Sequence, residues 1–157
     1  MATVFLGIGS NIGDRQKQCE KALELLQEYG LRIAARSSLY RTEPWGKKEQ
    51  PWFFNMAIEG TTDYSPHALL DLIKKIEDEL GRQESVRWGP RSIDIDILLY
   101  DDIILNGHEL VIPHPLMHER EFVLRPLSEI APDKTHPVLT KPVKDLLQEV
   151  LHRKPGI

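Results

Sequence analysis

The alternation of residues from Ile93 to Tyr100 constrains the fold more than any other feature of the chain. Successive side chains on a β-strand point to opposite faces, so Asp94 and Asp96 share one face and the isoleucines around them share the other. The run that starts at Ile97 is apolar without a break, which is typical of a strand buried on both faces. The pattern predicts a core strand that begins with two carboxylates on one side.

Two carboxylates in this arrangement lie roughly 7 Å apart and can both hold divalent cations, and their hard oxygen ligands suit Mg²⁺. Three arginines precede them, at Arg82, Arg87 and Arg91. Guanidinium groups bind phosphate oxygens, so the stretch favours a site for a nucleoside triphosphate. The alternative is an edge strand whose solvated aspartates pair with Arg91 on the surface. We favour the ligand site because Asp is disfavoured in strands and these two lie at the mouth of a buried one.

Composition indicates one ordinary globular domain over residues 1–157. The chain has 41% hydrophobic and 28% charged residues, and its net charge of −4 argues against a nucleic-acid surface. The single cysteine, Cys19, cannot form an internal disulfide, and the first residues resemble no secretion signal. No apolar run approaches the length of a membrane span of about 18 residues. We therefore expect a soluble, cytoplasmic protein without a membrane partner.

The N-terminal strand, Val4 to Ile8, leads into a glycine-rich turn. Its glycines are spaced one residue too far apart for a dinucleotide fingerprint, and Glu43 comes too late to bind a ribose, so we expect a helix start at Asp14 instead. The helix should end at Gly30. It should bury Cys19 as a small core residue rather than expose it as a nucleophile.

A strand from Ile33 to Tyr40 and another from Trp52 to Ile58 should follow. Asn55 is the unusual residue of the second strand. A primary amide offers a donor and an acceptor side by side, the complement of a pterin or purine edge, and Phe53 and Trp45 are nearby aromatic residues. A structural role for this Asn in a bulge or turn is the alternative. Its aromatic neighbours favour a flat heteroaromatic ligand.

The second half of the chain should contain three helices and a hairpin. Ser65 and Pro66 begin a helix that Gly81 should end, packed beside the first helix. The following polar loop is a candidate lid. A hairpin turn is expected at Asn106-Gly107, and helices at His118 to Leu127 and near Val143 to Leu151. His114 lies between two prolines, where it is either structural or a phosphate ligand.

Four motifs together resemble one enzyme family. They are Gly9-Ser10-Asn11, Phe53-Phe54-Asn55, Arg87-Trp88-Gly89-Pro90-Arg91 with Asp94 and Asp96, and Pro113-His114-Pro115 followed by Arg120-Glu121-Phe122. The chain resembles the 6-hydroxymethyl-7,8-dihydropterin pyrophosphokinases of folate biosynthesis over about residues 3 to 132. The resemblance implies a single α+β domain with a ferredoxin-like antiparallel sheet and helices on both faces, in three layers α/β/α. It also implies transfer of pyrophosphate from ATP to the pterin hydroxymethyl group, and a possible association with other folate enzymes.

The resemblance implies a role for each matching residue. Asp94 and Asp96 would hold two Mg²⁺ ions, and Arg82 and Arg91 would act with them in catalysis. The residues implied in ATP binding are Arg82, Arg87, Arg91, Ile97, Val111, His114 and Arg120. Those implied in pterin binding are Thr42, Glu43, Trp45, Phe53, Asn55, Asp94 and Phe122.

One residue departs from the family pattern. Glu84 stands where the family usually has a basic residue, and a carboxylate there would repel ATP, so either the loop closes differently or Arg82 and Arg87 compensate. Two other functions fit parts of the sequence. A ligand-binding module without catalysis would explain the fold but not paired aspartates beside arginines. A D-x-D glycosyltransferase would need a larger nucleotide-sugar domain than this length allows.

Overall fold

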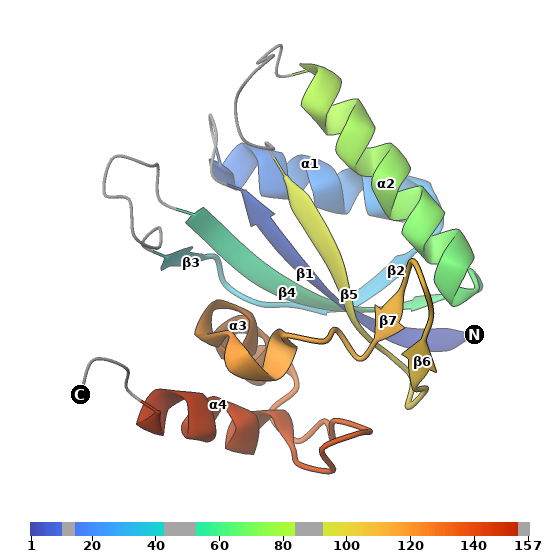
Figure 1. Ribbon diagram of the computed structural model, residues 1–157. Helices are drawn as coiled ribbons and strands as arrows, with labels where there is room; N and C mark the ends of the chain where they lie inside the picture. The colour runs from blue at the N-terminus through green and yellow to red at the C-terminus, as the bar shows by residue number, and fades with distance from the viewer. Residues whose placement is uncertain (11–14, 43–52, 84–92, 154–157) are drawn as a thin grey trace.

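The structure, a computed structural model, describes residues 1–10, 15–42, 53–83 and 93–153 of the 157-residue chain (Figure 1). It is a mixed fold with an antiparallel sheet and four α-helices in the described part. The elements are β1 (Ala2–Ser10), α1 (Arg15–Glu28), β2 (Arg32–Arg36), β3 (Tyr40–Thr42), β4 (Phe53–Thr62), α2 (Pro66–Gln83), β5 (Asp94–Tyr100), β6 (Leu105–Asn106), β7 (Val111–Ile112), a 3-10 turn (Met117–Glu119), α3 (Glu121–Ile130) and α4 (Val143–His152). None of these helices is both long and apolar enough to cross a membrane.

The main sheet has the strand order β2-β4-β1-β5, and β3 pairs with the start of β4. All its pairings are antiparallel. Strands β4 and β1 are therefore both central; β1 lies between β4 and β5, and its apolar residues Val4 and Leu6 have no exposed surface. Strands β6 and β7 form a separate hairpin, which confirms the hairpin predicted around Asn106-Gly107; its loop is closed by a hydrogen bond from Gly107 N to Leu110 O.

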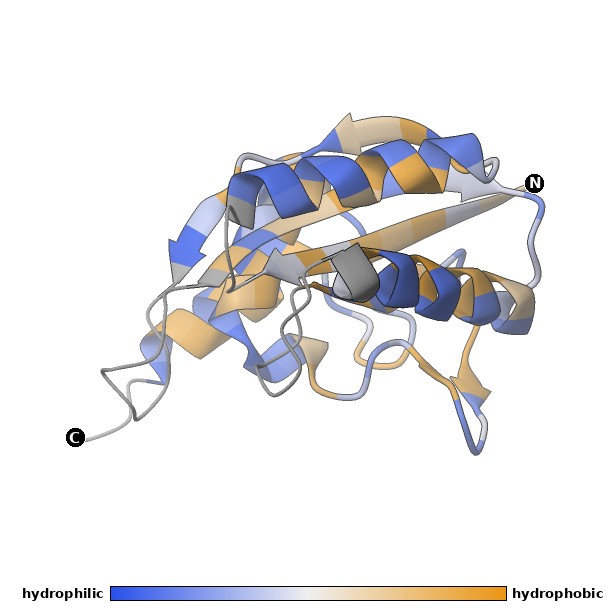
Figure 2. Ribbon diagram, turned by 90° about the horizontal axis from the view of Figure 1, so that it is seen from above, coloured by the Kyte–Doolittle hydropathy of each residue, from blue (hydrophilic) through white to orange (hydrophobic). Residues whose placement is uncertain are grey.

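Hydrophobic clusters lie on both faces of the sheet. Leu6 and Ile58 belong to a cluster with α1 and α2, whereas their neighbours Phe5 and Ala57 belong to a cluster with α3 and α4. Neighbouring residues of a strand point to opposite faces, so α1 and α2 cover one face and α3 and α4 the other (Figure 1). Figure 2 shows that α1 and α2 each combine hydrophilic and hydrophobic sides, as expected for helices that cover a sheet.

Helix ends were predicted correctly at Ser65 and Gly30 but not at Gly81. The Ser65 hydroxyl accepts the Ala68 N–H at 3.3 Å as an N-cap, and Gly30 follows α1 with a positive φ of +107°. Helix α2 continues through Gly81 to Gln83, so the prediction that Gly81 ends it is wrong. Glycine in a helix costs only about 1 kcal/mol, which the buried apolar stripe of α2 outweighs.

The strand predicted from Ile33 to Tyr40 is divided into β2 and β3. At the break, Ser37 N donates to Ala57 O, and the Ser37 hydroxyl accepts the Ala57 N–H, both at 2.9 Å. The hydroxyl thus takes the place of a backbone carbonyl, and the ladder stops there. The helix predicted from His118 is also divided, because Arg120 is extended (φ −115°, ψ 108°) between the 3-10 turn and α3. The C-terminal helix lies where it was predicted, as α4.

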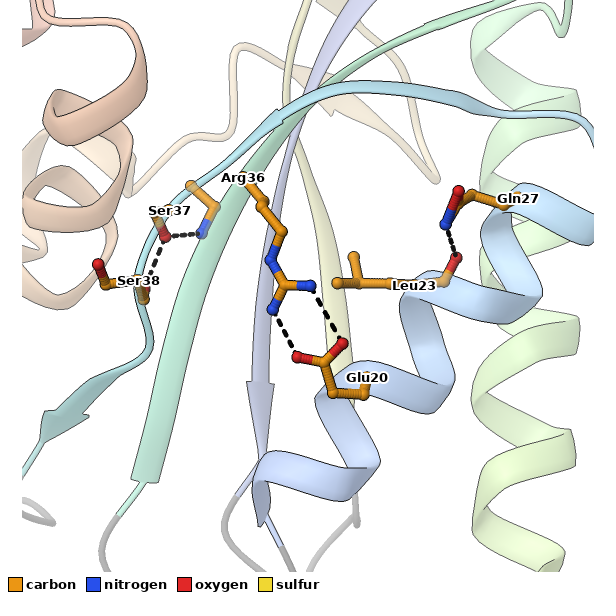
Figure 3. A network of polar contacts seen from close by, with 7 residues as sticks. Glu20, Leu23, Gln27, Arg36, Ser37 and Ser38 are labelled. Carbon is orange, nitrogen blue, oxygen red and sulfur yellow. Dashed lines mark hydrogen bonds and ion pairs between the residues drawn. The ribbon is translucent and has the colours of Figure 1, made fainter.

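An ion pair joins β2 to α1 on the face covered by α1 and α2. Arg36 Nη1 and Nη2 contact the two carboxylate oxygens of Glu20 at 3.0 and 2.6 Å (Figure 3). The adjacent Cys19 is fully buried, and burial raises the pKa of its thiol to about 12. This thiol stays protonated at neutral pH, which confirms that Cys19 is a core residue and not a nucleophile.

Candidate active site

Sheet pairing aligns candidate ligand residues in two rows. Asp94 of β5 pairs with Gly9 of β1, Gly9 pairs with Asn55 of β4, and Asn55 pairs with Tyr40 of β3. In the next row, Asp96 pairs with Gly7, and Gly7 pairs with Ala57. Residues directly opposite in antiparallel strands point to the same face, so both aspartates and Asn55 share the face covered by α3 and α4.

The β5 pattern agrees with the sequence prediction. Ile93, Ile95 and Ile97 are at most 4% exposed, whereas Asp94 is exposed and Asp96 is half-buried. The strand is an edge of the main sheet, but its outer edge is partly covered: His114 N donates to Leu98 O at 3.0 Å. The two carboxylates therefore lie at the start of a strand that is otherwise buried. This differs from the alternative of a strand with one fully solvated face.

Gly9 allows Asn55 to reach across the central strand. A Cβ at position 9 would lie 2.8 Å from Asn55 Oδ1, closer than real Cβ contacts. A Cβ at Gly7 would make an ordinary contact with Leu98, at 3.5 Å. The position of the Asn55 amide thus requires a glycine at position 9, whereas packing does not require a glycine at position 7.

His114 lies in the electrostatic range of both Asp96 and Arg120. Burial lowers the pKa of His114, the carboxylate of Asp96 raises it and the guanidinium of Arg120 lowers it, with burial as the largest effect. The Leu116 N–H donates to His114 Nδ1 at 3.2 Å, so the neutral ring has its proton on Nε2. The ring can therefore donate a hydrogen bond from Nε2 to an anionic ligand.

Phe122 connects this group of residues to α3. The Arg120 guanidinium lies over the Phe122 ring, 5.5 Å from its centre, and Phe122 is half-buried in the first turn of α3. Asp96 and Arg120 thus both lie near His114, and Arg120 in turn contacts Phe122. These residues combine an acid, a neutral imidazole, a fixed cation and an aromatic plane.

The other predicted residues divide into two groups. Arg82 lies in the last turn of α2, Ile97 is buried in β5, Val111 is half-buried in β7, and Thr42 of β3 pairs with Phe53 of β4. The remaining ones lie outside the described residues: Glu43, Trp45, Arg87 and Arg91. The N-terminal glycine turn, the candidate lid loop and Glu84 also lie there in whole or in part.

Glu77 lies next to the site and was not found from the sequence. Glu77 Oε2 on α2 accepts the backbone N–H of Ile95, between the two aspartates, at 2.8 Å. This bond joins α2 to the strand end that presents both carboxylates. The available indication was a Glu four residues after Ile73, beside the apolar stripe of α2.

Comparisons with known proteins relate this chain to one enzyme family. A sequence profile of the family described as 7,8-dihydro-6-hydroxymethylpterin-pyrophosphokinase (HPPK) matches residues 5–132. A 2-amino-4-hydroxy-6-hydroxymethyldihydropteridine pyrophosphokinase of Aquifex aeolicus is 46% identical over 149 residues, which cover 95% of this chain and 92% of that protein. The enzyme with this name from Methylorubrum extorquens is 48% identical over 134 residues, 85% of each chain.

The solved structures agree on the fold. A Plasmodium falciparum HPPK-DHPS crystal structure matches 98% of this chain with a TM-score of 0.77 at 20% sequence identity. This chain spans 44% of that longer protein. At such identity the likeness concerns the fold, and the sequence matches establish the relationship. The chain belongs to the 7,8-dihydro-6-hydroxymethylpterin-pyrophosphokinase family.

Proposed function

We propose that this protein transfers the β,γ-pyrophosphoryl group of ATP to the hydroxymethyl oxygen of 6-hydroxymethyl-7,8-dihydropterin in folate biosynthesis. The new bond joins that oxygen to the β-phosphorus, and the bond from the β-phosphorus to the AMP oxygen breaks. The products are AMP and the pterin pyrophosphate. The main support is the row of Asp94, Gly9 and Asn55, which places a pterin-complementary amide and a carboxylate on one face of the sheet.

Asp94 and Asp96 fit Mg²⁺. The candidate ligands are this carboxylate pair, since the described residues contain no group of three or more His, Cys, Asp or Glu side chains that could hold a metal ion. Mg²⁺ typically binds one or two carboxylates and completes its shell with waters and substrate phosphates. When bound, two such ions would neutralise phosphate charge and orient the β-phosphorus. Asp94 is exposed and Asp96 is half-buried, so neither residue is enclosed in the core.

The residues around Asp96 support phosphate binding. We propose that His114 donates from Nε2 to a phosphate oxygen and that Arg120 binds the same chain of phosphates. A neutral donor and a fixed cation stabilise the negative charge of the transferring group without a proton transfer. The other residues of the proposed ATP site are Arg82, Arg87, Arg91, Ile97 and Val111, with Arg82 and Arg91 acting on the transferring group.

The pterin would bind over the Asn55 row. We propose that the Asn55 amide pairs with the pterin edge and that Phe122 stacks on the ring, opposite Phe53. The further members of the proposed pterin site are Thr42, Glu43, Trp45 and Asp94. Since Asp94 lies in the Asn55 row, the hydroxymethyl group of a pterin bound there would lie beside the metal ligands.

Three broader statements belong to the proposal. The order β2-β4-β1-β5, with helices after β1 and β4, supports a ferredoxin-like fold in three layers, formed by residues 1–157 as one domain. The fused HPPK-DHPS protein supports an association with other folate enzymes. A cytoplasmic location stays a prediction from the sequence.

A product assay tests the proposed reaction. Protein, Mg²⁺, ATP and 6-hydroxymethyl-7,8-dihydropterin are incubated, and chromatography separates AMP from ADP. We expect AMP and pterin pyrophosphate in equal amounts. Production of ADP would indicate an ordinary kinase, and pterin binding without turnover would indicate a binding module.

Two variants connect the activity to the carboxylate pair. Asp96→Asn keeps the size of the side chain and removes its charge, and we expect turnover to fall at least about 100-fold. Asp71→Asn, on an exposed position of α2, removes the same charge away from the site and should keep full activity. Equal activity in both variants would exclude Asp96 from the metal site.

A further inference from the structure

Glu129 of α3 forms four hydrogen bonds to the segment that leads into β3. Its carboxylate accepts the Ser38 N–H at 3.1 Å on Oε1 and 3.2 Å on Oε2, the Ser38 hydroxyl at 3.2 Å and the Tyr40 hydroxyl at 2.7 Å. Hydrogen bonds donated by Tyr40 and Ser38 lower the pKa of Glu129. The bond between Tyr40 and Glu129 also raises the pKa of Tyr40. One ionised carboxylate thus joins two elements that are about ninety residues apart in sequence.

The segment joined to Glu129 borders the proposed pterin site. Tyr40 lies directly opposite Asn55, and Thr42 pairs with Phe53. Figure 3 shows Ser37 and Ser38 on the connection between β2 and β3. Ser37 attaches this connection to β4 through Ala57, and Glu129 attaches it to α3. Strand β3 has only three residues and within the described part pairs only with β4, so these attachments add to the few contacts that position it.

Glu129 also lies on the side of α3 that presents Phe122. The two residues are seven apart, which is nearly two full turns of an α-helix, so their side chains leave the helix in about the same direction. Helix α3 contacts both β3 and β4. A bond at Glu129 therefore sets the rotation of Phe122 relative to the strands with Asn55 and Thr42.

The buried core would keep α3 folded against the sheet even without this bond, which leaves its exact rotation to be set by Glu129. Leu124 and Leu127 have no exposed surface and pack in the cluster shared with α4. Glu129 and Ser38 are exposed, and exposed polar pairs add little to stability. We therefore expect Glu129 to set the distance between β3 and α3, which border the proposed pterin site, and to contribute little to the stability of the fold.

We propose that Glu129 is a positioning residue for pterin binding, which acts through Tyr40 and Ser38 by holding β3 against α3. The inference rests on the proposed function, because it concerns the pterin site of that reaction. It assigns no contact between Glu129 and the substrate.

Steady-state kinetics with both substrates varied test this role. We expect Glu129→Ala to raise the KM for the pterin about tenfold, the scale of losing one hydrogen bond to a charged group. The KM for ATP should stay within about twofold and the Tm nearly unchanged. Glu149→Ala is the matched control, because Glu149 also accepts an exposed hydrogen bond on this side of the sheet, from Lys141 at 2.7 Å, and lies on α4.

Tyr40→Phe removes only the 2.7 Å bond and provides a second measurement. It should raise the pterin KM in the wild-type background and have no effect in the Glu129→Ala background. Fluorescence titration of the pterin should show the same loss as a weaker Kd. An unchanged pterin KM, or an equal rise of both KM values, would overturn the inference. If the wild-type protein forms no AMP, the proposed function fails instead, and the wild-type assay alone shows this.

Discussion

Gly9 illustrates at the scale of a residue how the sheet and the ligand site depend on each other. The Asn55 amide occupies the space of the missing Cβ, with Oδ1 only 2.8 Å from where that atom would be. We expect Gly9→Ala to turn the amide away and remove the hydrogen bonds proposed between Asn55 and the pterin, which would be worth about 1 to 3 kcal/mol. The pterin KM should rise about tenfold, measured by steady-state kinetics.

Gly7→Ala is the control for this substitution. It adds a methyl group to the same face of β1, at ordinary contact distance from Leu98. It should fold and bind pterin like the wild type. A Gly9→Ala protein with the pterin KM of the wild type would show that Asn55 does not bind the pterin edge.

Residue positions in the site were predictable where a local period decides them. The alternation in β5 places Asp94 and Asp96 on one face, and the structure confirms it. The requirement for Gly9 becomes visible only when the pairing register places it opposite Asn55. Glu77 and Glu129 were missed because their partners are a backbone N–H, a serine and a phenol on elements remote in sequence, which no local pattern brings together.

At the scale of the element, two glycines differ in what they do to their helices. Gly81 lies inside α2, and its Cβ would meet no atom within 4 Å. Gly30 follows α1 with a φ of +107°, a conformation that L-residues rarely adopt. We expect Gly81→Ala to raise the free energy of unfolding by about 0.5 to 1 kcal/mol, and Gly30→Ala to lower it by about 1 to 2 kcal/mol.

Urea denaturation of both variants measures these opposite effects, and each variant is the control for the other. The slopes with denaturant should stay equal, since neither change alters the surface exposed on unfolding. A destabilised Gly81→Ala protein would mean that this glycine, which precedes Arg82, has a conformational role that its position in α2 does not require.

The errors in predicting where elements end have one physical origin. Backbone dihedral angles and hydrogen bonds between remote residues decide the ends, and a local sequence pattern reveals neither. A glycine ends a helix only if the chain there adopts a positive φ, and the sequence Leu80-Gly81-Arg82 does not reveal φ. Similarly, the apolar pattern from Ile33 continues across Ser37, but its hydroxyl bonds to Ala57 and divides the strand. The element order and the N-cap at Ser65 were predictable because periodicity and capping are local.

At the scale of the whole molecule, α4 completes the face that contains the site. The family profile ends at residue 132, yet Val143 and Leu146 of α4 are nearly fully buried in the cluster with α3. The loop before α4 is closed by His136, whose Nδ1 accepts the Val138 and Leu139 N–H groups at 3.2 and 3.1 Å. The buried His136 ring therefore has to be neutral in the folded protein.

This histidine should make the molecule sensitive to mild acid. Burial, and then the neighbouring His118, lower the pKa of His136 below its ordinary value of 6.5. The unfolded chain therefore binds a proton more readily than the folded protein. Stability is fully present above the unfolded pKa and is lost as the pH falls from it toward the folded pKa, at about 1.4 kcal/mol for each unit between them. His114, whose pKa burial also lowers, contributes with the same sign.

We expect the free energy of unfolding to fall between about pH 7 and about pH 5.5, a range above the ordinary titration of the carboxylates. His136→Asn keeps an acceptor for the two N–H groups but cannot be protonated, so its free energy of unfolding should change less over this range. His108→Asn, on the exposed hairpin loop, should follow the wild type. Urea denaturation at several pH values measures all three proteins. If the His136→Asn protein lost as much stability as the wild type, the acid sensitivity would have to come from other groups, and His136 would contribute to the C-terminal loop only by its shape.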